Sequence, residues 1–339
     1  MQPLVSIVIP TRNRLPLLKQ AVGSCFVQTY RNLEIIVVDD GSTESINEAR
    51  LGDGVHDLRV IRQAAKGGSA ARNLGFSHAK GQFIQFLDSD DLLHPEKIAT
   101  QVEVLSKAAC LDMVYCLDGH FLKNIGDSNR LWNLPITYAD FDDLDRFLWE
   151  DVIWGTNAPL WRKEHVRRIG GWEESMICWQ DWEFHTKALI QGTKYTCVPR
   201  ILSYVRQDGV RTANSIIQQK RVESCLIGAR NVISLMEQKN IYLPHRKSFM
   251  VDFINRRIWW LLYIKGANSR DIQRRALQMV KDNLEDGRLK MVASALTPLV
   301  GCPGFPLMFK FFWLALRVNH HPALQHGMLT GVAGIAPPS

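Results

Sequence analysis

The sequence lacks the cysteine patterns that define two common classes of small, cross-linked fold. Its seven cysteines are odd in number, and no two of them form a Cys-x-x-Cys pair. Neither a disulfide framework nor a zinc cluster is therefore indicated, and a reducing, cytoplasmic compartment is expected. The apolar stretch from Leu4 to Ile9 is too short for a secretory h-region and has no basic flank before it, so no signal peptide is expected.

Two nucleotide-binding signatures are also missing. After the predicted first strand, residues 5–9, stands Pro10-Thr-Arg-Asn13 rather than Gly-x-Gly-x-x-Gly, which argues against a nicotinamide dehydrogenase. The Gly-rich segment ending in Pro-Lys of sugar-phosphate nucleotidyltransferases is absent from the same place. With 46% hydrophobic and 22% charged residues among 339, the composition is that of an ordinary globular protein, which excludes disordered and collagen-like classes.

Positive charge gathers in the last third of the chain. Residues 221–339 hold 16 basic and 7 acidic residues, a net of +9, whereas residues 1–220 carry −2 of the total of +7. Such a tail meets phosphate on an anionic membrane or a nucleic acid, or it is simply a solvated basic face. The sequence leaves these alternatives open, although no nucleic-acid partner is expected.

The first hundred residues alternate predicted strands and helices. Further strands are predicted at 34–38, 59–61, 83–87 and 111–115; helices are predicted to start after Asn13 as N-cap, at Ser69 as cap, and at Pro95. This alternation predicts an α/β fold with a mostly parallel, Rossmann-like central sheet flanked by helices. Ligands of such sheets bind beyond the carboxyl ends of the strands, where the Asp-rich turns after Val38 and Leu87 lie.

From about residue 214 the pattern becomes helical, which divides the chain into residues 1–215 and a basic helical region, residues 216–339. One apolar helix face is predicted from Val222, Leu226, Ala229, Ile233 and Met236. Met291 to Phe309 is 19 residues without charge, and a basic pair precedes an aromatic run at 258–264. Prolines within the uncharged segment argue against a membrane span, so a helix on the membrane surface and a packing layer remain as alternatives.

The sharpest local signal is the turn Asp88-Ser-Asp90-Asp91. Three carboxylates on one turn repel each other unless something positive lies among them, and Mg²⁺ or Mn²⁺ bridging to phosphate would meet that need. Taken alone, the turn is more typical of a helix N-cap cluster before Pro95.

Four motifs occur in order within a hundred residues: Pro10-Thr11-x-Asn13, Val38-Asp39-Asp40-Gly41-Ser42, Gly68-x-x-x-Arg72-Asn73-x-Gly75 and Phe86-Leu87-Asp88-Ser89-Asp90-Asp91-x-x-x-Pro95. Together they resemble the family 2 glycosyltransferases, inverting enzymes of the GT-A fold that use nucleotide-diphosphate sugars. The resemblance implies a donor-binding half at residues 1–110 and an acceptor half at 111–215.

The resemblance also implies roles for single residues. Pro10, Thr11, Asn13, Asp40, Arg72 and Asp88 would bind the donor nucleotide, with Asp40 accepting a hydrogen bond from the base. Asp88 and Asp90 would hold Mg²⁺ or Mn²⁺, and Asp91 would support them. For Arg72, a phosphate or Asp88 contact and a helix-surface ion pair are both open.

Trp179-Gln180-Asp181-Trp182-Glu183 resembles the acidic motif that supplies the family's general base, which would be Asp181. Trp179, Trp182 and Glu183 would support the base or the acceptor; the alternative is that Asp181 caps a helix starting near Trp182. The family's usual first acid is replaced by Gln180. Many relatives have a His after an Arg in the strand that follows this helix. Here that His is missing, although Arg206 is present and could bind phosphates.

The resemblance thus implies transfer of a sugar, from a UDP-sugar first among donors, to a glycan or lipid-linked acceptor hydroxyl in cell-surface glycan synthesis. The basic C-terminal helices would then bring the enzyme into peripheral contact with the cytoplasmic face of a membrane. The alternative is a non-catalytic relative that binds nucleotide-sugars or glycans.

Overall fold

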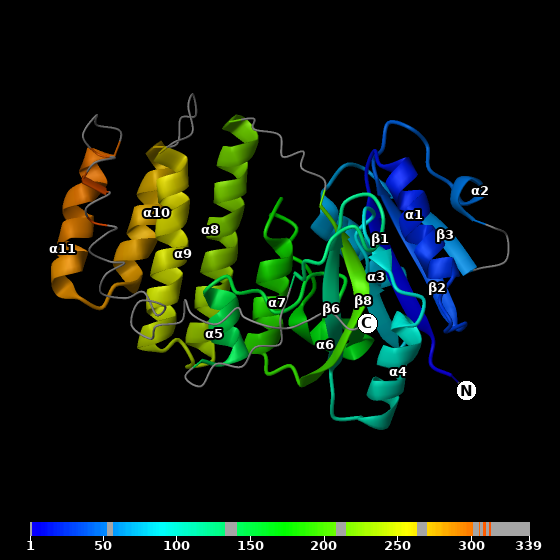
Figure 1. The fold of residues 1–339 in the computed structure, drawn as a ribbon. Helices are drawn as coiled ribbons and strands as arrows, with labels where there is room; N and C mark the ends of the chain where they lie inside the picture. Colours follow the sequence, from blue (N-terminus) through cyan, green and yellow to red (C-terminus); the bar gives the residue numbers. More distant parts are fainter. Residues whose placement is uncertain are drawn as a thin grey trace. The chain divides into compact units, whose positions relative to one another are not determined.

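The computed structural model describes residues 2–52, 57–132, 141–207, 215–262 and 270–300, together with Phe305, Met308, Phe309 and Phe312; at 215–218 and 258–262 it describes the backbone alone. The chain divides into two compact units (Figure 1). The sheet unit comprises Met1–Ala139 and Val152–Val210, and the helical unit comprises Asp140–Asp151 and Arg211–Ser339. The short stretch Asp140–Asp151 is thus grouped with helices that lie far downstream in the sequence.

Eight strands of the described chain form one sheet in the order β3-β2-β1-β4-β7-β6-β8-β5. They are β1 Val5–Thr11, β2 Leu33–Asp40, β3 Asp57–Gln63, β4 Phe83–Phe86, β5 Leu92–Leu93, β6 Met113–Phe121, β7 Leu160–Arg162 and β8 Tyr195–Arg206. The first four are mutually parallel, β6 and β8 are parallel, and β7 runs antiparallel to both of its neighbours. The predicted, mostly parallel sheet is confirmed.

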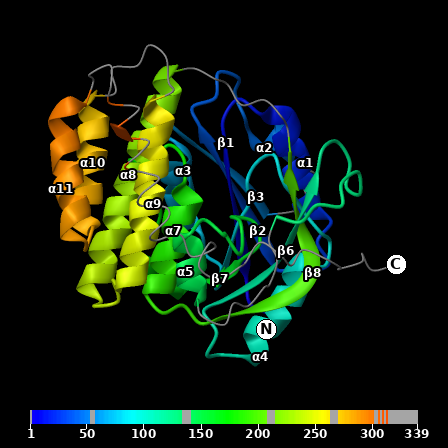
Figure 2. The same ribbon diagram turned by 60° about the vertical axis from the view of Figure 1, so that its left-hand side comes forward.

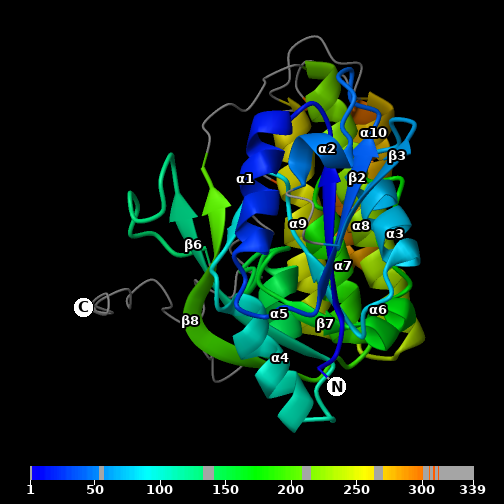
Figure 3. The same ribbon diagram turned by 90° about the vertical axis from the view of Figure 1, so that its right-hand side faces the viewer.

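Helices cover both faces of the parallel strands. The sheet unit contains α1 Leu15–Phe26, α2 Glu48–Leu51, α3 Gly68–His78, α4 Lys97–Lys107, α6 Lys163–Ile169 and α7 Gln180–Ile190. Figure 3 shows α1 on one side of β1 and β2 and α3 on the other. Because both faces are covered, the side chains of β1 are all buried, which explains why most of them are apolar.

Three predicted helix starts are wrong in detail. Asn13 does not cap α1: its backbone is left-handed (φ 54°), and Arg14 occupies the N-cap position without a side-chain bond. Ser69 lies inside α3, which begins at Gly68 after Gly67 with φ 99°. α4 begins at Lys97, two residues after Pro95. In each case the conformation of the loop before the helix, which residue type and periodicity do not reveal, decides where the helix begins.

The helical unit contains α5 Asp143–Leu148, α8 Ser215–Gln238, α9 Pro244–Leu262, α10 Arg270–Asn283, α11 Gly287–Leu296 and the short 3-10 helix η1 Thr297–Leu299. Figure 2 shows α8 to α11 side by side. The predicted apolar face of α8, Val222 to Met236, is buried. Among the residues described, no helix is long and apolar enough to cross a membrane. No side chain of the aromatic run 258–264 and only part of those of Met291–Phe309 are among the described residues.

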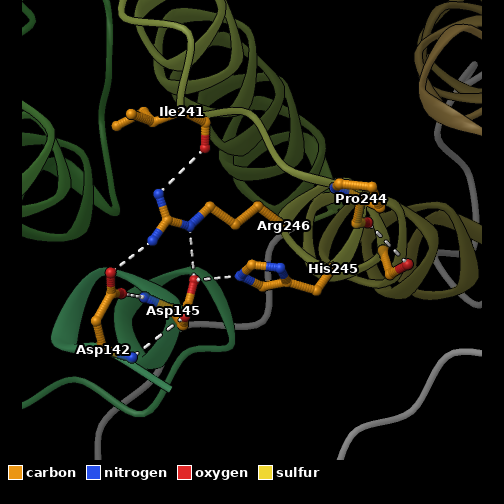
Figure 4. A network of polar contacts seen from close by, with 7 residues as sticks. Asp142, Asp145, Ile241, Pro244, His245 and Arg246 are labelled. Atoms are coloured by element: carbon orange, nitrogen blue, oxygen red, sulfur yellow. Dashed lines mark hydrogen bonds and ion pairs between the residues drawn. The ribbon is translucent and has the colours of Figure 1, made fainter. Parts of the chain in front are cut away.

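A polar network joins α5 to the start of α9 (Figure 4). The guanidinium of Arg246 donates to the carboxylates of Asp145 (2.7 Å) and Asp142 (2.5 Å), and to the carbonyl of Ile241 (3.1 Å). His245 contacts the same Asp145 oxygen at 3.1 Å. Asp145 and Arg246 are both buried, so the stretch 140–151 is held by groups withdrawn from water.

Candidate active site

The carboxyl ends of β1, β2 and β4 bring the predicted donor residues to one edge of the sheet. In the strand register Pro10 pairs with Val38 and Thr11 with Asp39. The turn that begins at Asp88 follows β4, which is the neighbour of β1 on its other side. Thr11 is buried, and its hydroxyl has no hydrogen-bond partner in the structure.

Asn13 orders the loop that follows β2. Its side-chain oxygen accepts hydrogen bonds from the amide (2.8 Å) and hydroxyl (3.1 Å) of Thr43, while its own amide donates to the Ser42 hydroxyl (2.9 Å). The Asp39 carboxylate accepts from the Ser42 amide (2.9 Å) and pairs with Arg62 (2.9 Å). The first two motifs are therefore tied together, and a nucleotide contact of Asn13 remains a prediction.

Asp40 is engaged by the loop that leads into α3. Its two carboxylate oxygens accept from the Gln63 side chain (2.7 Å) and from the amides of Lys66 (2.7 Å) and Gly67 (2.9 Å). Three donors on a 4% exposed carboxylate fix the loop before α3. The predicted bond from Asp40 to a nucleotide base is neither made nor tested in the structure, so it stays a prediction.

Arg72 connects the donor side of the site to the helix that carries Asp181. Its guanidinium donates to Asp88 (2.5 Å) and to the side-chain oxygen of Gln180 (3.1 Å), and it lies 4.5 Å above the ring of Trp172. Arg72 is 8% exposed. Of the two alternatives left open by the sequence, the Asp88 contact is present, and the pair is not on the helix surface.

Three buried polar atoms of β1 and α3 have no hydrogen-bond partner among the described residues. They are the hydroxyl of Thr11, the hydroxyl of Ser69 and Nε of Arg72. Buried donors without partners are rare, and the N-terminus of an 11-residue helix adds favourable potential for an anion. These groups can therefore accommodate a phosphate-bearing ligand at this edge.

Asp90 contacts two arginines. Its carboxylate pairs with Arg14 at 2.6 Å, and its carbonyl accepts from Nε of Arg206 at 2.9 Å. Arg14 is about half exposed, so the pair is open to exchange with other charged groups.

Asp91 is a buried support of the acidic turn. Its two carboxylate oxygens accept hydrogen bonds from the Asn157 side chain (2.6 Å) and the Arg206 amide (2.8 Å). Burial, together with the negative charges of Asp88 and Asp90, raises the pKa of Asp91 well above its ordinary value. A carboxyl group with these partners orders the turn, in line with the supporting role expected for it.

Arg206 fastens the end of β8 to the acidic turn and to α1. Its main-chain amide donates to Asp91, and its side chain donates to the Asp90 carbonyl and to Gln20 (2.7 Å). The guanidinium also lies 4.4 Å above the ring of Phe121. All three guanidinium nitrogens of Arg206 donate to groups of the protein. Direct contact with phosphates remains a prediction, whereas ordering of the turn is observed.

Asp181 lies in the first turn of α7 and is half-buried. The helix begins at Gln180 with Trp179 as N-cap, so Asp181 is not itself the cap. Removal of the carboxylate from water raises the pKa of Asp181, an effect that the negative charge of Asp88 reinforces and the amide of Trp182 and the charge of Arg72 oppose. A carboxylate with a raised pKa accepts protons more readily.

The residues on either side of Asp181 differ in role. Trp179 adopts a left-handed backbone (φ 58°), which is uncommon for a bulky residue and typical of functional sites. Its ring meets that of Trp182 edge-on at 6.4 Å. Trp182 and Glu183 are fully buried, and Glu183 lies 3.2 Å from Lys187. Trp182 and Glu183 therefore lie on the buried side of α7. Of the three residues, only Trp179 is partly accessible to solvent.

The acidic turn offers two carboxylates that could serve as oxygen ligands for a divalent cation. In the described part of the chain no group of three or more His, Cys, Asp and Glu side chains is placed to bind a metal. Asp88 and Asp90 supply oxygen donors of the kind that Mg²⁺ and Mn²⁺ prefer, and such ions commonly take one or two carboxylates plus substrate phosphates. The donor set therefore fits a cation that binds with a diphosphate.

Sequence reasoning missed two groups that shape the site. Arg14 follows the first motif directly, and a basic residue at that place is the only signal that could have indicated its pairing with Asp90. Asn157 is the second: it lies beneath the acidic turn, 2% exposed, and its side chain bonds Asp88 and Asp91. Trp154 and Trp161 nearby in the sequence are fully buried and belong to the core.

Comparison with known proteins shows which proteins the chain is similar to. Residues 6–166 match the family model for Glycosyl transferase family 2. The glycosyltransferase GlyG of Streptococcus pneumoniae is 43% identical over 103 residues, covering 30% of this chain and 34% of GlyG. An uncharacterized glycosyltransferase of Rickettsia felis is 39% identical over 104 residues, covering 30% and 17%. One of Haemophilus influenzae is 34% identical over 137 residues, covering 38% and 55%. The chain thus spans less than two thirds of each of these relatives.

The fold as a whole is similar to that of S. aureus TarS. The crystal structure of TarS 1-349 in complex with UDP aligns over 98% of this chain and 94% of that one, with a TM-score of 0.64 and 16% identity. TarS 1-349 in complex with UDP-GlcNAc aligns over 96% and 92%, with a TM-score of 0.61. The fold is therefore that of a GT-A-type glycosyltransferase with a helical C-terminal region. The match of residues 6–166 to the family 2 model confirms the resemblance predicted from the four motifs.

The pair between Arg14 and Asp90 predicts competition with a cation. Replacing Arg14 with Gln is expected to increase the affinity for Mn²⁺ about two- to fivefold, because a half-exposed ion pair contributes up to about 1 kcal/mol. Titration followed by the electron paramagnetic resonance signal of free Mn²⁺ measures this, and Arg12→Gln, at an exposed position two residues away, is the control. Equal or weaker Mn²⁺ binding by the Arg14 variant would contradict the prediction.

Proposed function

We propose that the protein transfers a sugar from a nucleotide-diphosphate sugar to an acceptor hydroxyl, with inversion at the anomeric carbon. The observation that carries the proposal is the Asp88–Arg72–Gln180 connection, which joins the donor edge of the sheet to the helix bearing Asp181. A base held beside the donor site is what a single displacement requires. The family 2 domain and the four motifs support the same reaction.

In this proposal the donor lies across the ends of β1, β2 and β4. Its diphosphate would take up the unpaired donors of Thr11, Ser69 and Arg72 on β1 and α3. Asp88 and Asp90 would hold a divalent cation together with the diphosphate; when bound, that ion neutralises charge on the leaving group. UDP is the nucleotide we expect first, since TarS was crystallised with UDP and with UDP-GlcNAc.

The acceptor hydroxyl would lose its proton to Asp181. The raised pKa of this carboxylate suits it to accept a proton during attack. Asp88, the second carboxylate nearby, is paired with Arg72 and would serve the donor instead. A nucleophile that approaches from the Asp181 side, opposite to the departing diphosphate, gives an inverted product. A glycan or lipid-linked acceptor in cell-surface glycan synthesis is the substrate class we infer.

The experiment that tests the reaction combines a donor panel with product analysis. Purified protein is incubated with UDP-, GDP- and dTDP-sugars and Mn²⁺, with simple sugar and lipid-linked acceptors, and release of nucleoside diphosphate is measured. Proton NMR of the product then gives the anomeric configuration. We expect one donor class to react with inversion; a product that retains the donor's configuration would refute the mechanism, and binding without any turnover would favour a non-catalytic relative.

We also propose that the helical unit makes peripheral contact with a membrane. On α11, the basic residues Arg288 and Lys290 and the apolar residues Met291 and Val292 are all exposed, Met291 by 68%. Apolar side chains beside cationic ones are typical of helices that bind anionic lipid surfaces.

Changing Met291 and Val292 together to Glu should abolish flotation with vesicles that contain anionic lipid, because it removes the apolar contact and adds repulsion. Val27→Glu is the matched control, since Val27 is a similarly exposed (58%) hydrophobic residue of the sheet unit. Equal flotation of the double variant and the unmodified protein would refute the contact through α11.

A further inference from the structure

A lysine whose described hydrogen bonds include none to a carboxylate lies inside the sheet unit. Lys97 is the first residue of α4 and is fully buried. The described hydrogen bonds of its ammonium group go to amide oxygens, and the charge of buried Asp118 only partly compensates the ammonium charge. Burial lowers the pKa of Lys97 to about 8, which reflects the cost of a charge in this place. A cation at a helix N-terminus also opposes the helix dipole. Such an unfavourable arrangement requires a compensating role.

The partners of Lys97 are two buried glutamines. Its ammonium group donates to the side-chain oxygens of Gln85 (2.5 Å) on β4 and Gln101 (2.6 Å) on α4. Because an ammonium group can only donate, it forces both amides to present their oxygens to it and their NH₂ groups away from it. The lysine therefore determines the orientation of both glutamine side chains.

The NH₂ groups so oriented hold the main chain just before β7. Gln85 donates to the carbonyl of Asn157 at 2.8 Å, and Gln101 donates to the carbonyl of Ala158 at 2.9 Å. These carbonyls can only accept, so the reverse orientation of either amide would set oxygen against oxygen. Two consecutive peptide groups are thereby fixed by one ammonium group.

Asn157 passes this constraint on to the acidic turn. Its side-chain oxygen accepts from the amide of Asp88 at 2.9 Å, and its side-chain nitrogen donates to the carboxylate of Asp91 at 2.6 Å. One amide side chain thus holds both ends of the turn that carries the proposed donor ligands. Lys97 touches none of the turn residues itself in any described contact, so any effect on them passes through Gln85 and Asn157.

We propose that Lys97 is a positioning residue for the donor site, which it serves by orienting Gln85 and Gln101 so that Asn157 holds the turn Asp88–Asp91 in its ligand-binding geometry. The inference rests on the proposed function for its consequence, nucleotide binding. The claim that Lys97 orders the turn Asp88–Asp91 does not depend on that function. A lysine that merely fills the core would affect the stability of the whole unit and not the turn selectively.

The test compares Lys97→Met with Lys107→Met. Both changes remove one lysine of α4, but Lys107 is 74% exposed and pairs only with Glu103 in the described contacts. Hydrogen exchange at the amides of residues 88–91 is measured in the free protein, together with the melting temperature and the affinity for UDP with Mn²⁺. The Asp88 amide reports directly, because it donates to Asn157.

For Lys97→Met we expect a melting temperature close to that of the unmodified protein, since loss of a buried charge offsets loss of its hydrogen bonds. Exchange at residues 88–91 should accelerate about tenfold and the nucleotide affinity should fall about tenfold, as for the loss of one or two hydrogen bonds. Lys107→Met should change neither. Unchanged exchange in the turn with Lys97→Met would overturn the proposal.

A second variant keeps the proposal testable if Lys97→Met does not fold. Gln85→Met removes the connection to Asn157 and leaves the bond between Lys97 and Gln101. It should loosen residues 88–91 in the same selective way, and exchange like that of the unmodified protein would count against the proposal. If the unmodified protein binds no nucleotide, the proposed function fails, and the exchange measurement still decides the role of Lys97.

Discussion

Asp181→Asn is expected to lower the rate of sugar transfer by about 100- to 10,000-fold, the usual contribution of a general base. Donor binding should change little, because the nearest described links of this helix to the donor edge run through Gln180 and Arg72 rather than Asp181. Transfer by single-turnover kinetics and donor affinity by calorimetry measure the two effects separately. Transfer at the unmodified rate would remove Asp181 as the base, and loss in Glu183→Gln instead would move the role to Glu183.

The same substitution is expected to stabilise the protein near neutral pH. Because folding raises the pKa of Asp181 above its ordinary 3.8, the folded state holds the proton more tightly than the unfolded state. The carboxylate therefore costs stability at pH values above the raised pKa, and this cost disappears as the pH falls below 3.8. Asp181→Asn should melt higher at pH 7 and equally at pH 3.5, with exposed Asp57→Asn as the control. A lower melting temperature at pH 7 would contradict the burial argument.

Arg246→Met should cause the largest loss of stability that we expect from a single change in the helical unit. It leaves buried Asp145 without the guanidinium that bonds it at 2.7 Å, and breaking a buried pair costs about 3–5 kcal/mol. At roughly 2–4 °C per kcal/mol, the melting temperature should fall by several degrees or more.

Arg275→Met is the matched control for this change. Arg275 pairs with Glu223 and Asp271 but is 55% exposed, so its loss should cost under about 1 kcal/mol. Adding Asp145→Asn to the Arg246 variant should restore part of the lost stability, because it removes the uncompensated charge. Equal effects of the two arginine changes would show that the α5–α9 network does not hold residues 140–151.

This network also bears on how the chain can be divided. The sequence predicts a boundary near residue 215, because helical periodicity begins there. Residues 140–151 lie in the middle of the sheet unit's sequence, yet their α5 packs against α9. We therefore propose that a chain ending at residue 215 would lack the partners of Asp142 and Asp145, and that the two units are best produced together.

The sequence predicts the frame of the donor site well. Buried strands read as apolar runs, and the carboxyl ends of parallel strands share an edge, so the pattern alone places Thr11, Asp40 and Asp88 near one another. The sequence does not predict which arginine side chain contacts which polar group of the site. Arg72 and Gln180 are 108 residues apart, and Arg206 and Asp90 are 116 apart, so no local spacing could reveal those contacts.

Local rules failed where a tertiary contact competed with them. Asn13 is a good helix cap by type, but its side chain instead binds Thr43 from a left-handed backbone. Ser69 is likewise a good cap by type, yet the helix starts one residue earlier at glycine, leaving its hydroxyl buried and unpaired. Such departures from local preference lie at the proposed site, where a ligand would supply the missing partner.

Calorimetric titration of UDP, GDP, dTDP and CMP, each with and without Mn²⁺, into the unmodified protein and Asp90→Asn tests the central claim most directly. The account predicts that one nucleotide, UDP first, binds more tightly with Mn²⁺, and that Asp90→Asn abolishes the enhancement by the metal. Absence of binding for every nucleotide, or an Asp90 variant that binds nucleotide and metal like the unmodified protein, would contradict the assigned donor site.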